Sequence, residues 1–361
     1  MSVPPKHKWL LIYLLLASAI IIGLTWTGVR ITSDSRLYLM GADLLSQGDL
    51  SQAKKILTWR PCPIGYPIIL MCMEKLVGGE MGITGVVIES DRSHVSVFVN
   101  NPKDKLWDVQ GPDIIRDIVW ARAVSIVGFI MTVAGMFLWG YKIGGIKAAH
   151  FSTWSLIVCL PVVHLFTGAW TEGMFVPMSL FSLYFIHGYS QDGSRQNLFL
   201  SAIFTLVAFA IRHIGIVFVM VGLWYLLQKD IRMKSWWCLP WLILVLLPLV
   251  WYWQLSAERS WATTGLKQAG EFVRVLASEM GVLIVVLIFL WRQIRAKIWS
   301  GLWLTIILQM SVLMALSWYN WVSPTDTNRY LASVYPFIMI ALAQVISEAV
   351  ESGRVRGEFG V

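Results

Sequence analysis

Apolar segments about 20 residues long recur along this chain, and they constrain its fold more than any other feature. An α-helix rises about 1.5 Å per residue, so each segment matches the roughly 30 Å hydrocarbon core of a bilayer. Hydrophobic residues make up 57% of the 361 residues and charged residues only 14%, unlike a soluble domain. The alternating pattern of outer-membrane strands is missing. The sequence therefore predicts an all-α fold, a polytopic transmembrane helical bundle in one domain over residues 1–361.

The number of spans depends on how residues 197–228 fold. They form either one long helix with Arg212 and His213 at its middle or two short helices that meet at this pair. A charge at mid-bilayer costs roughly 3 kcal/mol, and only the two-helix hairpin leaves the basic segments QKDIRMKS and WRQIRAKIWS on one side. We therefore expect about ten spans, with both termini in the cytoplasm and Arg212 near the outer face. The other predicted spans cover residues 9–29, 118–140, 148–166, 172–189, 236–254, 279–291, 301–318 and 330–348.

Residues 30–117 form the longest polar segment and are predicted to be the first extracytoplasmic loop, with juxtamembrane helices. The apolar run from Ile64 ends before Glu74, which allows about 15 Å of helix, half of what a span needs. It is expected to lie on the membrane surface or dip into it.

The stretch SDSRLYLMGADLL, at the start of this loop, is predicted to be a second short helix. Asp34 and Tyr38 are one turn apart, so both lie on the same face. Arg36 and Asp43 are expected on the solvated side of the helix. An interfacial helix with a merely solvated charged face explains the spacing equally well.

The net charge of +8 does not indicate a nucleic-acid partner. Much of it lies in short loops between apolar runs, where the positive-inside rule accounts for it. The four cysteines show no metal-ligand spacing. We therefore expect membrane lipids as surroundings, and neither nucleic acid nor a bound metal.

The predicted topology places on the outer face the polar side chains that are unfavourable near lipid. Each of them has a purely structural and a functional interpretation. Glu172 opens a helix, where the helix dipole alone explains an acid. Arg212 indicates a buried anionic partner, either a ligand or a carboxylate such as Glu172. Arg329, before Tyr330, fits a snorkelling anchor when considered alone. The outward residues are Asp34, Arg36, Asp43, Glu172, Arg212, His213, Asp326 and Arg329.

Aromatic side chains also collect at the predicted outer boundary. Most are typical of an interfacial belt, although one or two are available to stack on a sugar ring. These residues are Trp59, Tyr66, Trp170, Trp318, Tyr319 and Trp321.

Taken in order, several segments resemble the GT-C superfamily of polytopic glycosyltransferases, which contains protein O-mannosyltransferases (family 39-type) and bacterial aminoarabinose and mannose transferases. They are DSRLYLMGADLL, IGYPIIL, the run from ARAVSIVG to TEGMF, IRHIGIVF and NRYLASVYP. Many relatives carry paired acids in the first loop, whereas Asp34 here is flanked by Ser33 and Ser35.

The resemblance implies an inverting glycosyl transfer on the extracytoplasmic side, from a polyprenyl-phosphate-linked sugar donor to an acceptor that is a lipid, a glycan or a protein. It implies Asp34 as the general base, with Arg329, Arg212 and secondarily His213 on the donor phosphate. Phosphate leaves readily, so no metal or other cofactor is required. The supporting side chains would be Glu172, Tyr38, Tyr66 and Tyr330. The expected location is the plasma membrane, which in a bacterium is the inner membrane, with the endoplasmic reticulum as the alternative.

Two alternatives use the same features. A flippase or other transporter of lipid-linked sugars would also hold anionic headgroups with membrane arginines, although no inverted repeat is apparent in the sequence. A membrane assembly subunit without activity would use residues 80–117 as a docking surface.

Overall fold

A computed structural model describes residues 5–59, 63–79, 81, 83–88, 95–99, 111–230, 301–318 and 327–358. The predicted spans 236–254 and 279–291 lie outside these residues, so the expected number of spans stays a prediction. In chain order the elements are α1 (Pro5–Leu24), β1 (Val29–Ile31), α2 (Ser33–Ser46), α3 (Leu50–Trp59), α4 (Gly65–Val77), β2 (Ile83–Ile88), β3 (Val95–Val99), β4 (Ile114–Arg116), α5 (Val119–Val158), α6 (Leu160–His164), α7 (Glu172–Asp192), α8 (Arg195–Ile211), the 3-10 turn η2 (His213–Gly215), α9 (Ile216–Asp230), α13 (Gly301–Trp318), α14 (Thr327–Ala332) and α15 (Tyr335–Glu358).

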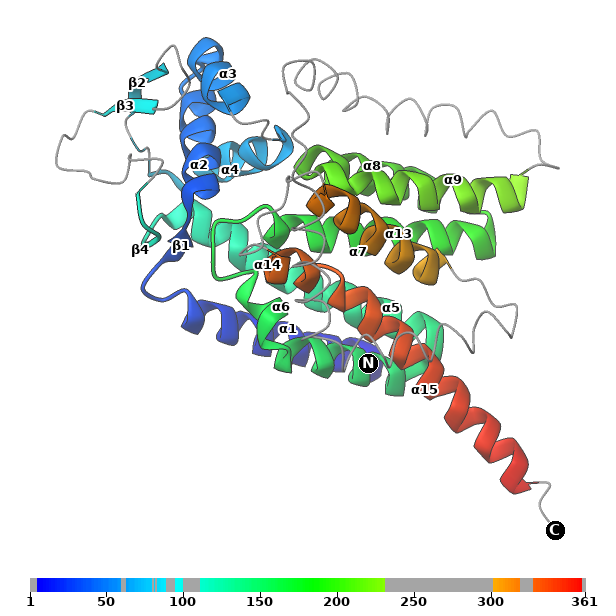
Figure 1. Ribbon diagram of the computed structural model, residues 1–361. Coiled ribbons are helices and arrows are strands. Elements are labelled where there is room, and N and C mark those ends of the chain that lie inside the picture. The colour runs from blue at the N-terminus through cyan, green and yellow to red at the C-terminus, as the bar shows by residue number, and fades with distance from the viewer. Residues whose placement is uncertain are drawn as a thin grey trace.

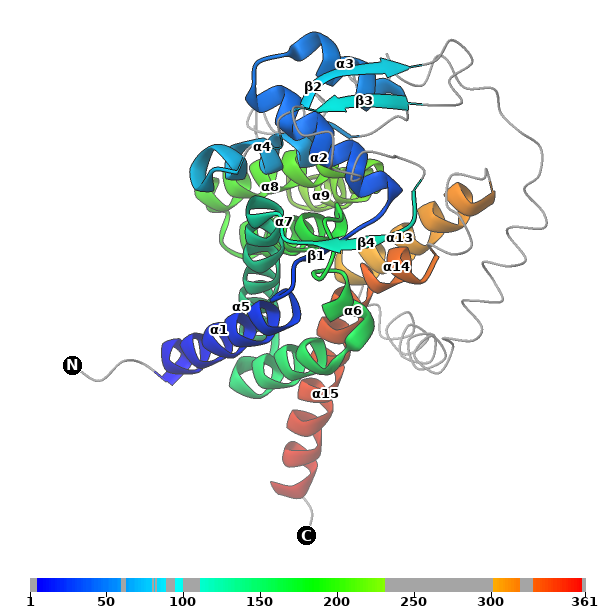
Figure 2. The ribbon, with the colours of Figure 1, turned by 90° about the vertical axis from the view of Figure 1, so that its left-hand side faces the viewer.

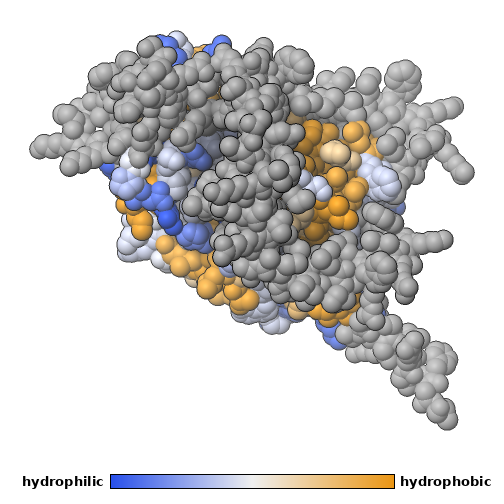
Figure 3. Space-filling view, viewed as in Figure 1, coloured by the Kyte–Doolittle hydropathy of each residue, from blue (hydrophilic) through white to orange (hydrophobic). Residues whose placement is uncertain are grey.

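The long helices form one bundle, and α2, α3 and α4 lie together across one end of it (Figure 1). Among the described residues, α1 from Lys6 to Leu24 and α5 are long and apolar enough to cross a bilayer. Exposed apolar side chains such as Leu11, Leu15 and Trp26 lie on and just after α1. Figure 3 shows further hydrophobic side chains on the surface of the bundle. Such a surface is typical of helices that face lipid.

Helix α5 folds back on itself, as the two predicted spans 118–140 and 148–166 require. The turn lies at Gly144 and Gly145, and the φ of +68° at Gly145 favours glycine. Across the turn, the Ser152 hydroxyl donates a hydrogen bond to the carbonyl of Met136 over 3.1 Å. The two halves of α5 are therefore antiparallel neighbours.

The structure confirms the hairpin interpretation of residues 197–228. The chain leaves helical geometry at Arg212, whose φ and ψ are −148° and 140°. Helix α9 then runs alongside α7 in the same direction: Phe175 contacts Phe218 near their starts, with ring centroids 5.8 Å apart, and His187 contacts Tyr225 farther along, at 6.3 Å. Because α8 follows α7 after a short turn and packs against it, the turn at Arg212 returns to the end of the bundle where α7 begins.

Two small β-ribbons depart from the all-α expectation. β1 pairs antiparallel with β4, and β2 pairs antiparallel with β3. The segments VVI and VSVFV are rich in β-branched residues, a local preference that counting spans overlooks. The other edge of β1 is also held, since the Arg30 amide donates to Thr167 and the Ala169 amide donates back to Arg30. β1 therefore ties the start of α2 to the loop that precedes α7 (Figure 2).

The expectation that Arg36 and Asp43 are solvated is wrong. Arg36 is 2% exposed and donates to the carbonyls of Gly111 and Pro112. Asp43 is fully buried and accepts hydrogen bonds from the amides of Met81 and Ile83. Both charges fasten the long loop to α2, which leaves Asp34 as the acid of this helix that reaches the surface.

Candidate functional site

Glu172 is the first residue of α7 and lies at the centre of the candidate site. Its carboxylate is completely buried, and the hydroxyl of Thr171 donates a hydrogen bond to its Oε2 over 3.1 Å. Taking a carboxylate out of water costs several kcal/mol unless charged partners compensate. Its position at the helix start is favourable to the dipole, but capping alone does not explain this burial.

Two arginines supply that compensation on the same carboxylate oxygen. Arg212 Nη1 forms an ion pair with Glu172 Oε1, and Arg329 Nε lies 2.9 Å from the same atom. The arginine side chains are only 10% and 13% exposed. The competing explanation for Arg212, a carboxylate partner in the protein, is therefore confirmed. Arg329 is held inside the protein, so a snorkelling anchor does not describe it.

Aromatic rings pack around both guanidinium groups. The Arg212 guanidinium lies 4.2 Å from the ring centre of Tyr330, and that of Arg329 lies 5.4 Å from the ring of Trp170. Cation–π contacts of this kind contribute about 0.5–2 kcal/mol each and fix the planes of the guanidinium groups. The positive charges are thus held in place before any ligand arrives.

Asp34 lies at the rim of this cluster. It is in the first turn of α2, after the N-cap Thr32, whose hydroxyl accepts a hydrogen bond from the Ser35 amide. Its side chain is 34% exposed, and Oδ2 is 3.8 Å from Arg329 Nη2. Of the two carboxylates, only that of Asp34 is reachable by a substrate.

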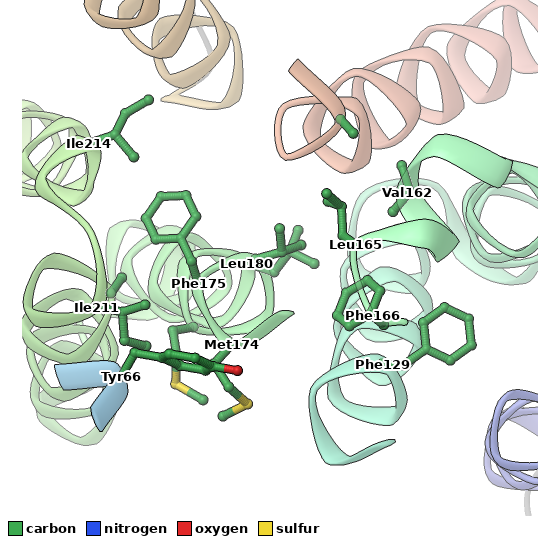
Figure 4. Close-up of a cluster of buried hydrophobic side chains, with 14 of the residues drawn as sticks. Tyr66, Phe129, Val162, Leu165, Phe166, Met174, Phe175, Leu180, Ile211 and Ile214 are labelled. Atoms are coloured by element: carbon green, nitrogen blue, oxygen red, sulfur yellow. The ribbon is translucent and has the colours of Figure 1, made fainter. Parts of the chain in front are cut away.

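Tyr38 and Tyr66 lie beside the charges. Tyr38 follows Asp34 by one turn, and its ring meets that of Tyr66 edge to face, with centroids 5.5 Å apart. Tyr66, at the start of α4, is buried among Phe175, Met174 and neighbouring apolar side chains (Figure 4). Burial, and secondarily the negative charge of Glu172, raise the pKa of the Tyr66 phenol, so it stays a hydrogen-bond donor.

The structure therefore brings Asp34, Glu172, Arg212 and Arg329 together, although they are far apart in sequence. The backbone of His213 begins the turn after Arg212, but its side chain lies outside the described part of the chain.

The belt interpretation fails for Tyr66 and Trp170, which are 1% and 5% exposed. The contact of Trp170 with Arg329 was missed, although its place two residues before Glu172 was a signal. Trp59, Trp318, Tyr319 and Trp321 have side chains outside the described residues. In the part of the chain that the structure describes, no three His, Cys, Asp or Glu side chains form a group able to hold a metal, and metal independence stays a prediction.

Comparison with known proteins shows which solved structures have a similar fold. No protein-family model matches the chain, and no curated protein matches its sequence. Two solved structures of ArnT from Cupriavidus metallidurans, an aminoarabinose transferase of the GT-C family, are similar to it. The structure bound to undecaprenyl phosphate has a TM-score of 0.57 at 15% identity, over 93% of this chain and 60% of ArnT. The apo structure has a TM-score of 0.56 at 14% identity, over 94% and 60%.

The chain thus spans about three fifths of the length of the ArnT chain that it matches. The likeness shows that this chain shares the fold of ArnT, a polytopic membrane protein, and the sequence resemblance to the GT-C superfamily is in line with this fold.

Proposed function

We propose that this protein is a GT-C-type glycosyltransferase that moves a sugar from a polyprenyl-phosphate donor to an acceptor, with inversion at the anomeric carbon. The observation that carries the proposal is the chain of ionic contacts from partly exposed Asp34 through Arg329 to buried Glu172 and Arg212. It places a reachable carboxylate beside fixed positive charges. The undecaprenyl phosphate bound to ArnT, which has the same fold, supports a donor of this class.

Asp34 is the proposed general base. Its partly exposed carboxylate is able to accept a proton from an acceptor hydroxyl or amine that approaches from the surface. The contact with Arg329 is long, at 3.8 Å, so an arriving phosphate competes well for the guanidinium. Donor binding would then weaken the contact between Arg329 and Asp34 and so couple the two substrates.

Arg212 and Arg329 are the proposed phosphate-binding groups. Two guanidiniums sharing one carboxylate leave the buried cluster with a net charge of about +1 before Asp34 is counted. This charge favours the phosphate as it departs with a growing negative charge. Glu172 is a positioning residue that holds both arginines. His213 next to Arg212 is a proposed secondary contact, and Tyr330 orients Arg212.

The same fold suggests where the reaction occurs. We assign both termini to the cytoplasm, the site to the extracytoplasmic side and the protein to a bacterial inner membrane, as positive-inside counting indicates for the topology. The prenyl chain would then stay in lipid while the phosphate enters the site at the boundary.

Purified protein in liposomes tests the proposal with a polyprenyl-phosphate sugar labelled in the sugar. Transfer of the label to an acceptor, with release of polyprenyl phosphate, is expected. Movement of intact labelled lipid across the bilayer without release would instead show a transporter. An inactive assembly subunit would give neither transfer nor movement of the label.

A further inference from the structure

A polar cleft lies between the end of α1, the β1–β4 ribbon and the loop after α6. Its volume is about 440 Å³, and its lining is Leu24, Thr27, Gly28, Arg30, Asp113, Ile114, Ile115, His164 and Thr167. None of these residues takes part in the chemistry proposed above. The cleft has both polar groups and an apolar wall, so its lining favours a ligand that has a polar part and an apolar part.

The polar part of the cleft is the ion pair of Arg30 and Asp113, in which some polar atoms are not used by the pair itself. Arg30 donates through Nε and Nη2 to the same oxygen of Asp113, Oδ2, over 3.1 and 2.8 Å. Within the described part of the chain, Oδ1 of Asp113 and Nη1 of Arg30 have no hydrogen-bond partner. This ion pair therefore leaves one acceptor on Asp113 and one donor on Arg30, and hydroxyls of a sugar can use both.

The charge of the cleft argues against an anion. Arg30 and Asp113 cancel each other and are equally exposed, at 44% each. The remaining polar groups of the lining are the hydroxyls of Thr27 and Thr167 and the ring of His164. A phosphate would gain Arg30 but meet the Asp113 carboxylate at once, whereas a neutral polyhydroxyl group uses both.

The apolar wall continues into the surface that faces lipid. Leu24 is 51% exposed and Ile115 is 66% exposed, and Trp26 beside them is 75% exposed. In Figure 3, hydrophilic side chains over β1 and β4 adjoin hydrophobic ones over α1. A ligand in this cleft therefore meets polar groups at one end and lipid-facing side chains at the other.

The cleft is also close to the proposed base. Arg30 and Asp34 are four residues apart, so their Cα atoms are at most about 14 Å from each other. A second link runs through rings: His164 meets Trp170 edge to face at 5.2 Å, and Trp170 stacks on Arg329. The cleft is therefore linked to the Asp34 and Arg329 region by two routes, along the chain and through the rings.

We propose that this cleft binds the sugar headgroup of a lipid-borne acceptor, with Asp113 and Arg30 holding a pair of neighbouring hydroxyls. The biological role rests on the proposed glycosyl transfer, whereas binding in the cleft requires no turnover.

Photolabelling in nanodiscs tests the binding. The probe is dodecyl β-glucoside with a diazirine next to the headgroup, and dodecyl phosphate with the same diazirine is its charged counterpart. The glucoside is expected to label peptides containing residues 24–30 or 113–117, with the phosphate labelling them at least tenfold less.

Two variants of surface residues make the test specific. Asp113→Asn removes a charge-assisted hydrogen bond. At a probe concentration below saturation, labelling by the glucoside is therefore expected to fall about tenfold. Ile115→Trp fills the cleft from its exposed rim and has the same effect. The control is Asp117→Asn, which changes an exposed carboxylate paired with Arg122 outside the cleft lining and leaves labelling unchanged.

Equal labelling by the phosphate probe, or glucoside labelling that persists in both cleft variants, would overturn the proposal. Asp34→Asn separates the two claims, because it is expected to retain full cleft labelling while transfer is lost. Transfer that persists in Asp34→Asn would refute the assignment of the base and leave the cleft result standing.

Discussion

Replacing Glu172 with glutamine removes one negative charge from between two buried guanidinium groups and changes the side-chain shape very little. In the native protein Arg212 and Arg329 both contact Oε1 of a carboxylate with no solvent exposure. The glutamine amide accepts one hydrogen bond but carries no charge. The two arginines then repel each other with no counter-charge on Oε1.

The size of the effect follows from this geometry. Breaking a buried ion pair by removing one partner costs about 3–5 kcal/mol, because the other charge stays buried without compensation. Here one carboxylate serves two partners, so the upper part of that range applies. We expect Glu172→Gln to lower the free energy of unfolding by about 4–5 kcal/mol, measured by equilibrium denaturation in detergent micelles with circular dichroism.

Two further variants make this result interpretable. Glu348→Gln is the control, because Glu348 is exposed and, within the described residues, accepts a hydrogen bond only from Gln344, over 3.0 Å. A change of at most about 0.5 kcal/mol is expected. Combining Glu172→Gln with Arg329→Gln should give a coupling energy of at least about 1 kcal/mol, since one repelling charge is then removed. A Glu172→Gln protein within about 1 kcal/mol of the wild type would refute the account of the buried cluster.

Three further pairs of variants test separate parts of the structure. Arg329→Ala should weaken binding of polyprenyl phosphate more than Arg329→Lys does, measured by titration of the purified protein, and unaltered binding in both would count against a phosphate contact. Asp43→Asn should speed hydrogen exchange at the Met81 and Ile83 amides by about tenfold, because each loses a charged acceptor, whereas Asp49→Asn should leave those amides unchanged. Gly128→Ala should cost about 1–3 kcal/mol of stability, since a Cβ there would overlap the carbonyl oxygen of Gly173, while Gly23→Ala, with open space around it, should not destabilise the protein.

The main organisation of the bundle is predictable from sequence because it depends on hydrophobicity and charge. The hairpin at Arg212 follows from the cost of a charge at mid-bilayer and from the side on which basic loops must lie. Gly144 and Gly145 divide α5 where the apolar pattern divides it. Neither feature requires knowledge of which distant side chains come into contact.

Contacts between distant segments are harder to predict from the sequence. The fate of Arg36 and Asp43 depends on backbone groups near residues 111 and 81, which no helical spacing reveals. Sequence also left Arg212 with two candidate partners, a ligand or Glu172, and the packing of α7 against α8 decides between them. The ribbon of β1 and β4 joins segments that lie more than 80 positions apart.

Turnover of Asp34→Asn tests the central claim most directly. The wild type, Asp34→Asn and Asp117→Asn are reconstituted at equal amounts of folded protein, and release of polyprenyl phosphate from a labelled sugar donor is followed with an acceptor present. Asp117 also pairs with an arginine, at 2.9 Å, and is exposed. The account predicts transfer by the wild type and Asp117→Asn, and a loss of at least about a hundredfold in Asp34→Asn. Wild-type turnover in Asp34→Asn would contradict it.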